Sequence, residues 1–374
     1  MSGGSGTVSG GSGTVSDDGG GGPVDADAGP TFTALRLAQP APVGVGPGPL
    51  QVTELALPEL APEEVLVAVA ACAVCRTDLQ LASGDLPAHK LPVTPGHQTV
   101  GTITAVGSEV DEGRLGSLVG ITWFGGSCGV CSRCLSGRQN LCEQARFTGW
   151  DRDGGYATAV AARSDCAFDL PADYLSDLPA AQRAIAMSPL LCGGVIGYRS
   201  LRIAEVGPTS AGLRLGLYGY GASATLVLQV ARYWGCEVSV ITRSDAEVER
   251  ALAAGAHWAG TYQQQPPLLD AAITFAPVGD VVVSALKALD RGGIVAVNAI
   301  HLDRVPQFNY DDLWWERSLR SVANVTPADV REFLELVPRA GVATVHEELP
   351  LSEANSALAR LDAGEVRGSL VLVP

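Results

Sequence analysis

The sequence lacks any apolar run that reaches the roughly 20 residues that a membrane-spanning helix requires. Its first residues also lack the basic segment and apolar core of a secretory signal. Positive charge is scarce, because Lys90 and Lys287 are the only lysines and the net charge is −15. Nucleic-acid binding needs clustered Lys and Arg side chains, so this balance argues against such a partner. Together these absences predict a cytoplasmic protein with no membrane or nucleic-acid partner.

The chain's 374 residues are too many for one ordinary core and suit two domains. The first part is unlike the rest: residues 1–30 are rich in Gly, Ser and Asp, and SGGSGTV occurs twice over residues 2–15. Such a composition cannot bury enough apolar surface to offset the entropy of ordering the backbone. We expect residues 1–30 to be disordered, as a dispensable tail or a flexible tether.

Two regions with different sequence patterns follow this tail. From Phe32 to about Leu170, short β-rich runs are punctuated by Gly and Pro, which predicts a compact, mostly β domain. After Pro189, apolar runs such as EVSVIT alternate with amphipathic stretches such as DAEVERALAAGA. This alternation is typical of an α/β fold with a doubly wound parallel sheet. From about Thr326 the chain adds two helical segments and a last strand, SLVLVP.

Nine cysteines without a secretory signal favour metal ligation over disulfides. Four of them lie close together in the array CGVCSRCLSGRQNLC. Thiolates at this spacing can surround one tetrahedral Zn²⁺, whereas an iron–sulfur cluster and unrelated buried thiols are the alternatives. A closed four-thiolate site holds a lobe together and is not a reaction centre. The predicted structural zinc ligands are Cys128, Cys131, Cys134 and Cys142.

A glycine-rich loop, GYGASA at residues 219–224, stands between a strand-like run and a helical one. In a dinucleotide-binding loop Gly219 permits the tight turn, Gly221 lets the backbone approach a pyrophosphate, and Ala224 lets helix and sheet pack closely. Ala222 and Ser223 open the helix whose first N–H groups would face the phosphates. A purely structural turn between strand and helix is the alternative.

The end of the next strand predicts which cofactor is used. Binders of NAD usually place Asp or Glu about twenty residues past the glycines, to hold the ribose 2′-hydroxyl. Here that place is taken by Thr242, Arg243 and Ser244. A guanidinium with two hydroxyls beside it suits a 2′-phosphate, so the sequence predicts NADP(H). Asp245 is the objection, and we interpret it as an acid in the first turn of a helix.

With these elements in this order, the chain resembles the zinc-dependent medium-chain alcohol dehydrogenases from about Thr33 to Pro374. The resemblance rests on CRTDL, PGHQTVG, the four-cysteine loop, PLLCGG and the nucleotide loop. VITRS, FAPVG and DLWWERSLRSVANVT make it similar to an NADP-preferring bacterial branch. The resemblance implies a GroES-like catalytic domain at residues 31–190 and 327–374 and a Rossmann domain at residues 191–326. It also implies a homodimer or homotetramer.

The resemblance further implies a catalytic zinc held by Cys75, His97 and Cys192, and therefore two zinc ions per chain. Cys72 then becomes a small buried neighbour. A redox Cys-x-x-Cys normally opens a helix in a βαβ unit, whereas this pair ends a β-rich segment. Asp78 is expected to orient the metal site through His97, with a salt bridge or turn role as the alternative.

Further roles follow from the same resemblance. Thr77 matches the hydroxyl that bonds the substrate oxygen and starts a proton relay. Arg76 and Arg367 match contacts to the cofactor phosphates, with a solvated surface charge as the alternative for each. Trp123 and Trp150, together with Phe124, are expected to make an aromatic substrate cleft, unless they are ordinary core residues. His301 is expected near the nicotinamide, because ligands bind at the carboxyl ends of parallel strands.

Two positions depart from the family pattern: Gln80 stands where many relatives have a relay histidine, and Gln98 where many have glutamate. An amide is neither acid nor base near neutral pH, so we expect catalysis with an altered pH profile. The predicted function is hydride transfer between NADP(H) and an alcohol/aldehyde pair, with zinc as the Lewis acid. A zinc-independent quinone or enone reductase and a non-catalytic zinc-binding interaction protein are the alternatives.

Overall fold

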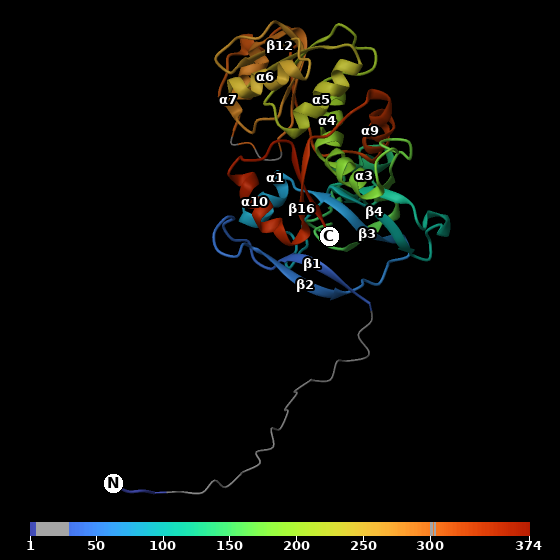
Figure 1. The fold of residues 1–374 in the computed structure, drawn as a ribbon. Helices are drawn as coiled ribbons and strands as arrows, with labels where there is room; N and C mark the ends of the chain where they lie inside the picture. The colour runs from blue at the N-terminus through green and yellow to red at the C-terminus, as the bar shows by residue number, and fades with distance from the viewer. Residues whose placement is uncertain (5–29, 300–301, 303) are drawn as a thin grey trace.

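The structure is a computed structural model that describes residues 1–4, 30–299, 302 and 304–374. Nearly all of the tail expected at residues 1–30, and His301, therefore lie outside the described residues. Two sheets organise the described chain, one at each end of the molecule, with the elements around β12, α6 and α7 farthest from β1 and β2 (Figure 1).

The first sheet is parallel throughout and has the strand order β12-β11-β10-β13-β14-β15. Counted along the chain this is the order 3-2-1-4-5-6 of doubly wound nucleotide-binding sheets, whose crevice opens at the carboxyl ends of the first and fourth strands. The strands are β10 (Arg214–Tyr218), β11 (Glu237–Thr242), β12 (Trp258–Thr261), β13 (Leu269–Thr274), β14 (Leu289–Val297) and β15 (Ser318–Ser321). The predicted doubly wound sheet is confirmed.

Helices connect these strands, as is usual for parallel strands, except between β12 and β13, where residues 262–268 form no helix. They are α5 (Ala222–Tyr233), α6 (Asp245–Ala253), α7 (Gly279–Lys287) and α8 (Tyr310–Leu313). The stretch VVVSALKALDRGG is divided between two elements, because α7 ends at Lys287 and β14 begins at Leu289. The register of β14 against β13 shifts beside the Gly-containing start of β14. Hydrogen bonding across the sheet therefore holds these residues in a strand, although their apolar pattern would continue the helix.

The second sheet is mixed and has the order β16-β17-β3-β4-β5-β9, with β8 paired to β3. Its strands are β3 (Glu64–Ala73), β4 (Thr99–Val106), β5 (Leu118–Ile121), β8 (Ala159–Arg163), β9 (Ala167–Asp169), β16 (His346–Pro350) and β17 (Ser369–Val373). The last strand pairs with β3, where Leu372 lies opposite Cys72. The carboxyl-terminal segment thus returns to the amino-terminal half. This is the GroES-like sheet that the resemblance implied, although the domain boundaries themselves stay a prediction.

Short elements complete the described chain. Two hairpin-like pairs join β1 (Thr31–Leu37) to β2 (Leu50–Ala56) and β6 (Phe124–Gly126) to β7 (Arg146–Phe147). The remaining helices are α1 (Arg76–Ser83), α2 (Ser132–Leu135), α3 (Ala180–Met187), α4 (Gly193–Ile203), α9 (Pro327–Ala340) and α10 (Ala354–Asp362). Single 3-10 turns are η1 (Glu112–Arg114), η2 (Gln139–Leu141), η3 (Ser164–Cys166), η4 (Ser188–Leu191) and η5 (Leu351–Glu353). Helix α9 begins in a capping box between Thr326 and Asp329.

One buried apolar cluster joins the two sheets, since it contains Val100 of β4 as well as Leu217 of β10. Phe124 belongs to this cluster and is 2% exposed, so its expected place in the substrate cleft was wrong. By length and composition the stretch Ala180–Ile203 could cross a membrane, but 72% of the 18-residue apolar window within it is buried inside the protein. We therefore treat it as core.

Candidate functional site

Three predicted ligands meet where the two sheets adjoin. Cys75 caps the start of α1 just after β3, His97 lies just before β4, and Cys192 precedes α4. Their candidate ligand atoms lie within 4.8 Å of one another, and the two sulfur atoms are 3.8 Å apart. Two thiolates and one imidazole leave a fourth tetrahedral position open, which is the ligand pattern of catalytic zinc sites.

Asp78 lies behind this cluster and is 2% exposed. One carboxylate oxygen accepts hydrogen bonds from the Gly96 backbone N–H at 3.1 Å and from His97 Nδ1 at 3.2 Å. The other accepts from the Cys75 backbone N–H at 2.9 Å and the Tyr156 hydroxyl at 3.1 Å. Because Nδ1 is engaged, Nε2 is the imidazole atom left for a metal. Asp78 therefore orients one ligand and fixes the backbone of another.

The electrostatics of the cluster suit a cation. Burial lowers the pKa of His97, but the charges of Asp78 and Cys75 outweigh it and raise that pKa to about 10. The hydrogen bond from Cys192 lowers the pKa of Cys75 well below its ordinary value, with help from the positive charge of His97. These side chains hold concentrated negative charge and a fixed imidazole in a buried place, so they fit a divalent zinc ion.

The peptide around His97 depends on a glycine. Gly96 has φ +98°, and a Cβ atom there would lie 2.5 Å from the Tyr156 ring and 2.9 Å from the Cys72 sulfur. Cys72 itself is 1% exposed and accepts a hydrogen bond from Thr99, and burial raises the pKa of its thiol to about 12. The pair of thiols ends a β-rich segment as expected, but Cys75 also begins a helix, as the second cysteine of the pair. It is the position of Cys72 inside β3 that separates the two thiols.

Three further residues near the cluster are placed by the structure. The Thr77 hydroxyl lies 3.8 Å from the Cys75 sulfur, and its side chain is buried. Gln98 is also buried and donates from Nε2 to the Ala73 carbonyl at 3.3 Å, so its amide is engaged with the backbone beside β3. Gln80 is half-buried on α1.

An aromatic wall adjoins the cluster. Trp123 meets His97 edge-on with ring centroids 4.8 Å apart, and Trp150 stacks on Trp123 at 5.7 Å. Phe147 packs against both, with ring centroids 5.5 Å from Trp123 and 5.8 Å from Trp150, and His89 stacks on the Trp150 ring at 3.7 Å. The two expected tryptophans therefore come together beside His97. Phe147 and His89 were missed, since nothing in their local sequence connects them with the pair.

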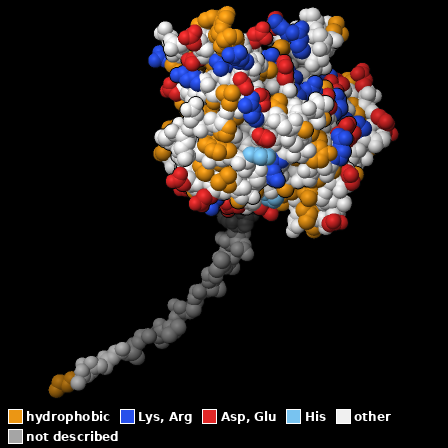
Figure 2. Space-filling model, turned by 90° about the horizontal axis from the view of Figure 1, so that it is seen from above, with side chains coloured by type: hydrophobic (Ala, Val, Ile, Leu, Met, Phe, Trp, Pro, Cys, Tyr) orange, Lys and Arg blue, Asp and Glu red, His pale blue; other side chains and the backbone are white. Residues whose placement is uncertain are grey.

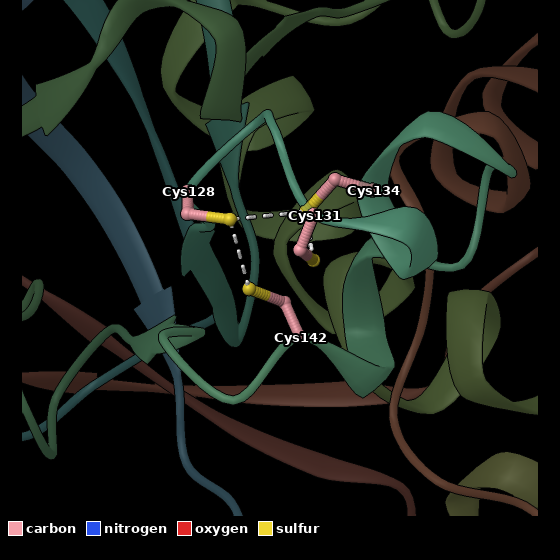
Figure 3. A group of neighbouring side chains, drawn as sticks. All are labelled: Cys128, Cys131, Cys134 and Cys142. Atoms are coloured by element: carbon pink, nitrogen blue, oxygen red, sulfur yellow. Dashed lines mark hydrogen bonds between the residues drawn. The ribbon is translucent and has the colours of Figure 1, made fainter.

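The other four predicted ligands form a separate group in the loop around α2 (Figure 3). Their sulfur atoms lie within 4.8 Å of one another, with Cys131 and Cys134 at 3.5 Å and Cys128 and Cys142 at 3.6 Å. Backbone N–H groups of Val130 and Cys131 lower the pKa of Cys128 to about 6. All nine cysteines of the chain are free. The thiols are thus grouped as one tetrahedral zinc would require.

The glycine loop lies at the carboxyl end of β10. Gly219 has φ +93°, and a Cβ atom there would come within 3.2 Å of the Ala276 backbone nitrogen. Gly221 caps α5, and a Cβ atom there would meet nothing within 4 Å, which leaves its outer side open to a ligand. Ala222 and Ser223 form the first turn of α5, and Ala224 is fully buried. The loop has the geometry that a pyrophosphate needs.

The predicted 2′-phosphate residues lie at the carboxyl end of β11. Thr242 is its last residue, Arg243 follows with its side chain 74% exposed, and Ser244 caps α6 by accepting from the Glu247 backbone N–H. Asp245 lies in the first turn of α6, as interpreted from the sequence. Glu247 was missed, although its side chain contacts both Thr242 and Arg243.

The other two arginines predicted to contact the cofactor, Arg76 and Arg367, are both exposed. Arg76 is 62% exposed and pairs with Asp362 at 3.9 Å. Arg367 is exposed, and no side-chain hydrogen bond or ion pair is recorded for it within the described residues. Their contacts with cofactor phosphates stay a prediction.

Comparison with known proteins places this architecture among its relatives. Residues 61–172 match the model of the alcohol dehydrogenase GroES-like domain. The chain is 45% identical over 350 residues to a probable alcohol dehydrogenase AdhA of Mycobacterium tuberculosis, covering 92% of this chain and 97% of the relative. An aldehyde reductase AdhA of Synechocystis is 29% identical over 335 residues, covering 87% and 95%. The solved structure of a "putative zinc-binding dehydrogenase" of Sinorhizobium meliloti bound to NADP superposes with a TM-score of 0.78 at 25% identity, covering 92% of this chain and 100% of that chain.

Proposed function

The chain belongs to the medium-chain alcohol dehydrogenase family, and on this basis we propose that it is a zinc-dependent enzyme that uses NADP(H). Membership of this family implies the interconversion of an alcohol and its aldehyde. The observation that carries the zinc proposal is the meeting of Cys75, His97 and Cys192, with Asp78 hydrogen-bonded to the imidazole. When bound there, zinc supplies Lewis acidity to the substrate oxygen, while the nicotinamide carries the hydride.

The chain's own side chains position the reactants. Asp78 holds the His97 ring through Nδ1, and Tyr156 holds Asp78. The aromatic wall that begins at Trp123 excludes water on one side of His97 and offers flat apolar contact. We therefore propose small aldehydes and alcohols with an aliphatic or aromatic body as substrates.

Proton transfer is proposed to begin at Thr77, whose buried hydroxyl lies next to the Cys75 sulfur. During alcohol oxidation this hydroxyl would accept the substrate proton and pass its own proton on. Gln80 cannot continue the path as an acid or base, so water must carry the proton from α1 to solvent.

Two findings support NADP(H) as the cofactor. The sequence TRS at the end of β11 provides a guanidinium and two hydroxyls where an NAD-binding chain usually has a carboxylate. The Sinorhizobium protein, similar over 92% of this chain, has NADP bound. In the same proposal Cys128, Cys131, Cys134 and Cys142 bind a second, structural zinc. A cytoplasmic location and a homodimeric or homotetrameric assembly stay predictions.

The test measures oxidation of NADPH and NADH by the zinc-loaded protein with a panel of aliphatic and aromatic aldehydes. We expect NADPH to be consumed faster, and Cys75→Ala to abolish turnover and remove about one zinc per chain. Cys72→Ala is the matched control, because it removes a neighbouring thiol outside the ligand cluster. Turnover that survives Cys75→Ala, or a clear preference for NADH, would contradict the zinc or the cofactor proposal respectively.

A further inference from the structure

A carboxylate already occupies the place where the proposed 2′-phosphate would bind. One oxygen of Glu247 accepts a hydrogen bond from the Thr242 hydroxyl. The other oxygen pairs with Arg243 Nε at 3.2 Å and with Arg250 Nη2 at 3.8 Å. The Glu247 side chain is only 14% exposed. Two guanidinium groups and a hydroxyl therefore surround one internal anion at the carboxyl end of β11.

Helix capping does not account for this arrangement. Ser244 and Glu247 have the S-x-x-E spacing in which the glutamate side chain usually returns to the backbone N–H of the cap. Here Ser244 accepts from the Glu247 backbone N–H, but the Glu247 carboxylate bonds Thr242 and Arg243. The side chain is directed to the end of the strand instead of the end of the helix.

Arg250 links this anion to the glycine loop. Its guanidinium carbon lies over the ring of Tyr220, 5.9 Å from the centroid, and Tyr220 stands between Gly219 and Gly221. Tyr220 is 5% exposed, so the ring is a fixed support. In doubly wound folds the glycine loop contacts the pyrophosphate and the end of the second strand contacts the adenosine ribose. Arg250 therefore lies between the glycine loop and the end of β11, where the adenosine ribose of a bound cofactor would be expected.

The Glu247 carboxylate and a 2′-phosphate would bind the same donors of this cluster. Guanidinium groups and hydroxyls are the donors that bind phosphate as well as carboxylate. Two negative charges within a few ångströms repel, so a 2′-phosphate and the Glu247 carboxylate compete for these donors. Figure 2 shows basic and acidic side chains intermingled over one face of the molecule.

We propose that Glu247 is an internal competitor of the 2′-phosphate and, together with Arg250, sets the preference between NADP(H) and NAD(H). A 2′-phosphate must displace the carboxylate from Arg243 and Arg250, whereas a plain 2′-hydroxyl leaves it in place. This inference rests on the proposed use of NADP(H). It adds that the affinity for the 2′-phosphate is held below what the two arginines alone would give.

The test is calorimetric titration of the full-length protein with 2′,5′-ADP and with 5′-AMP, which differ only by the 2′-phosphate. We expect Glu247→Gln to tighten 2′,5′-ADP binding about tenfold, the order of one close charge–charge interaction, and to leave 5′-AMP unchanged. Arg250→Gln should weaken 2′,5′-ADP binding by a similar factor. Glu249→Gln, the same charge change at an exposed position of α6, is the matched control and should alter neither affinity.

Each other outcome has a defined meaning. An unchanged or weakened affinity of Glu247→Gln for 2′,5′-ADP overturns the inference, as does an equal change for both nucleotides. If the parent protein binds 5′-AMP as tightly as 2′,5′-ADP while Glu247→Gln gains tenfold for 2′,5′-ADP, the NADP(H) preference fails but the competition holds. Glu247→Asp retains the charge but shortens the side chain, and should give a smaller gain. It provides the test if the glutamine variant does not fold.

Discussion

The hydroxyl of Tyr156 donates a hydrogen bond to the carboxylate of Asp78 at 3.1 Å, although the two residues lie far apart in the chain. Tyr156 is fully buried, and burial together with the negative charge of Asp78 raises the pKa of its phenol well above the ordinary value. The phenol therefore stays protonated and acts only as a donor. Through Asp78 it supports the position of His97, which makes Tyr156 a positioning residue for the proposed zinc site.

Removal of this donor should weaken metal binding. In Tyr156→Phe one lone pair of a buried carboxylate loses its partner, so we expect the free energy of unfolding to fall by about 1–3 kcal/mol. Zinc affinity at the cluster should fall about tenfold, as measured by competition with a chelator. Tyr174→Phe is the control, because the buried Tyr174 hydroxyl donates to the Val342 carbonyl away from the cluster. Equal zinc affinities in both variants would contradict a positioning role.

Removal of one thiolate from the four-cysteine loop should unfold this lobe without destroying the catalytic cluster. We expect Cys131→Ser to lower the metal content from about two zinc ions per chain to about one, because a hydroxyl is a poor substitute for a thiolate ligand. The melting temperature should fall by about 5 °C or more, since the binding energy of a structural zinc is folding energy. Elemental analysis and calorimetry measure both effects.

Cys236→Ala is the control for that variant. Cys236 is a buried thiol outside both clusters, so its loss should leave the metal content unchanged. A Cys131→Ser protein that keeps two zinc ions would show that the loop does not hold a structural zinc.

The meeting of the three proposed catalytic ligands could be expected from the family resemblance, because the motifs that carry them lie next to the ends of elements. Cys75 directly precedes α1, and Cys192 directly precedes α4, where side chains can leave the sheet and meet. The doubly wound parallel sheet likewise followed from the alternation of strands and helices, because right-handed crossovers leave few arrangements of such a chain.

The supporting contacts could not be predicted, because they depend on distances between remote segments. Tyr156 follows two glycines in a segment with no ligand motif, and only the close approach at Gly96 brings it to Asp78. Glu247 was hidden by a local pattern, since its spacing from Ser244 is that of a helix cap. Phe124 stands next to Trp123 in the sequence, but alternation along the chain directs it into the core.

The aromatic wall should select the substrate. In Trp150→Ala the stack between Trp123 and His89 loses its middle ring, so we expect KM for aromatic aldehydes to rise about tenfold. KM for short aliphatic aldehydes should change less than about threefold, because they cover less of the wall. Trp150→Phe keeps a ring but loses the hydrogen bond to the Pro87 carbonyl, and should retain most of the aromatic preference. A parallel rise of KM for both substrate classes would place Trp150 outside the substrate cleft.

The last prediction concerns the amide on α1. Gln80→His introduces a group with an ordinary pKa near 6.5 at a half-buried position three residues after Thr77. As a base for alcohol oxidation the imidazole must be neutral, so the variant's kcat should gain a limb that rises as pH increases through about 6–7. The parent protein should lack that limb, and aldehyde reduction should show the opposite slope, because it needs the protonated imidazole. Steady-state rates in both directions from pH 5 to 9 measure this. Gln80→Asn, which keeps an amide, should retain the parent profile, and a Gln80→His profile identical to both would mean that protons leave Thr77 by a path that does not pass position 80.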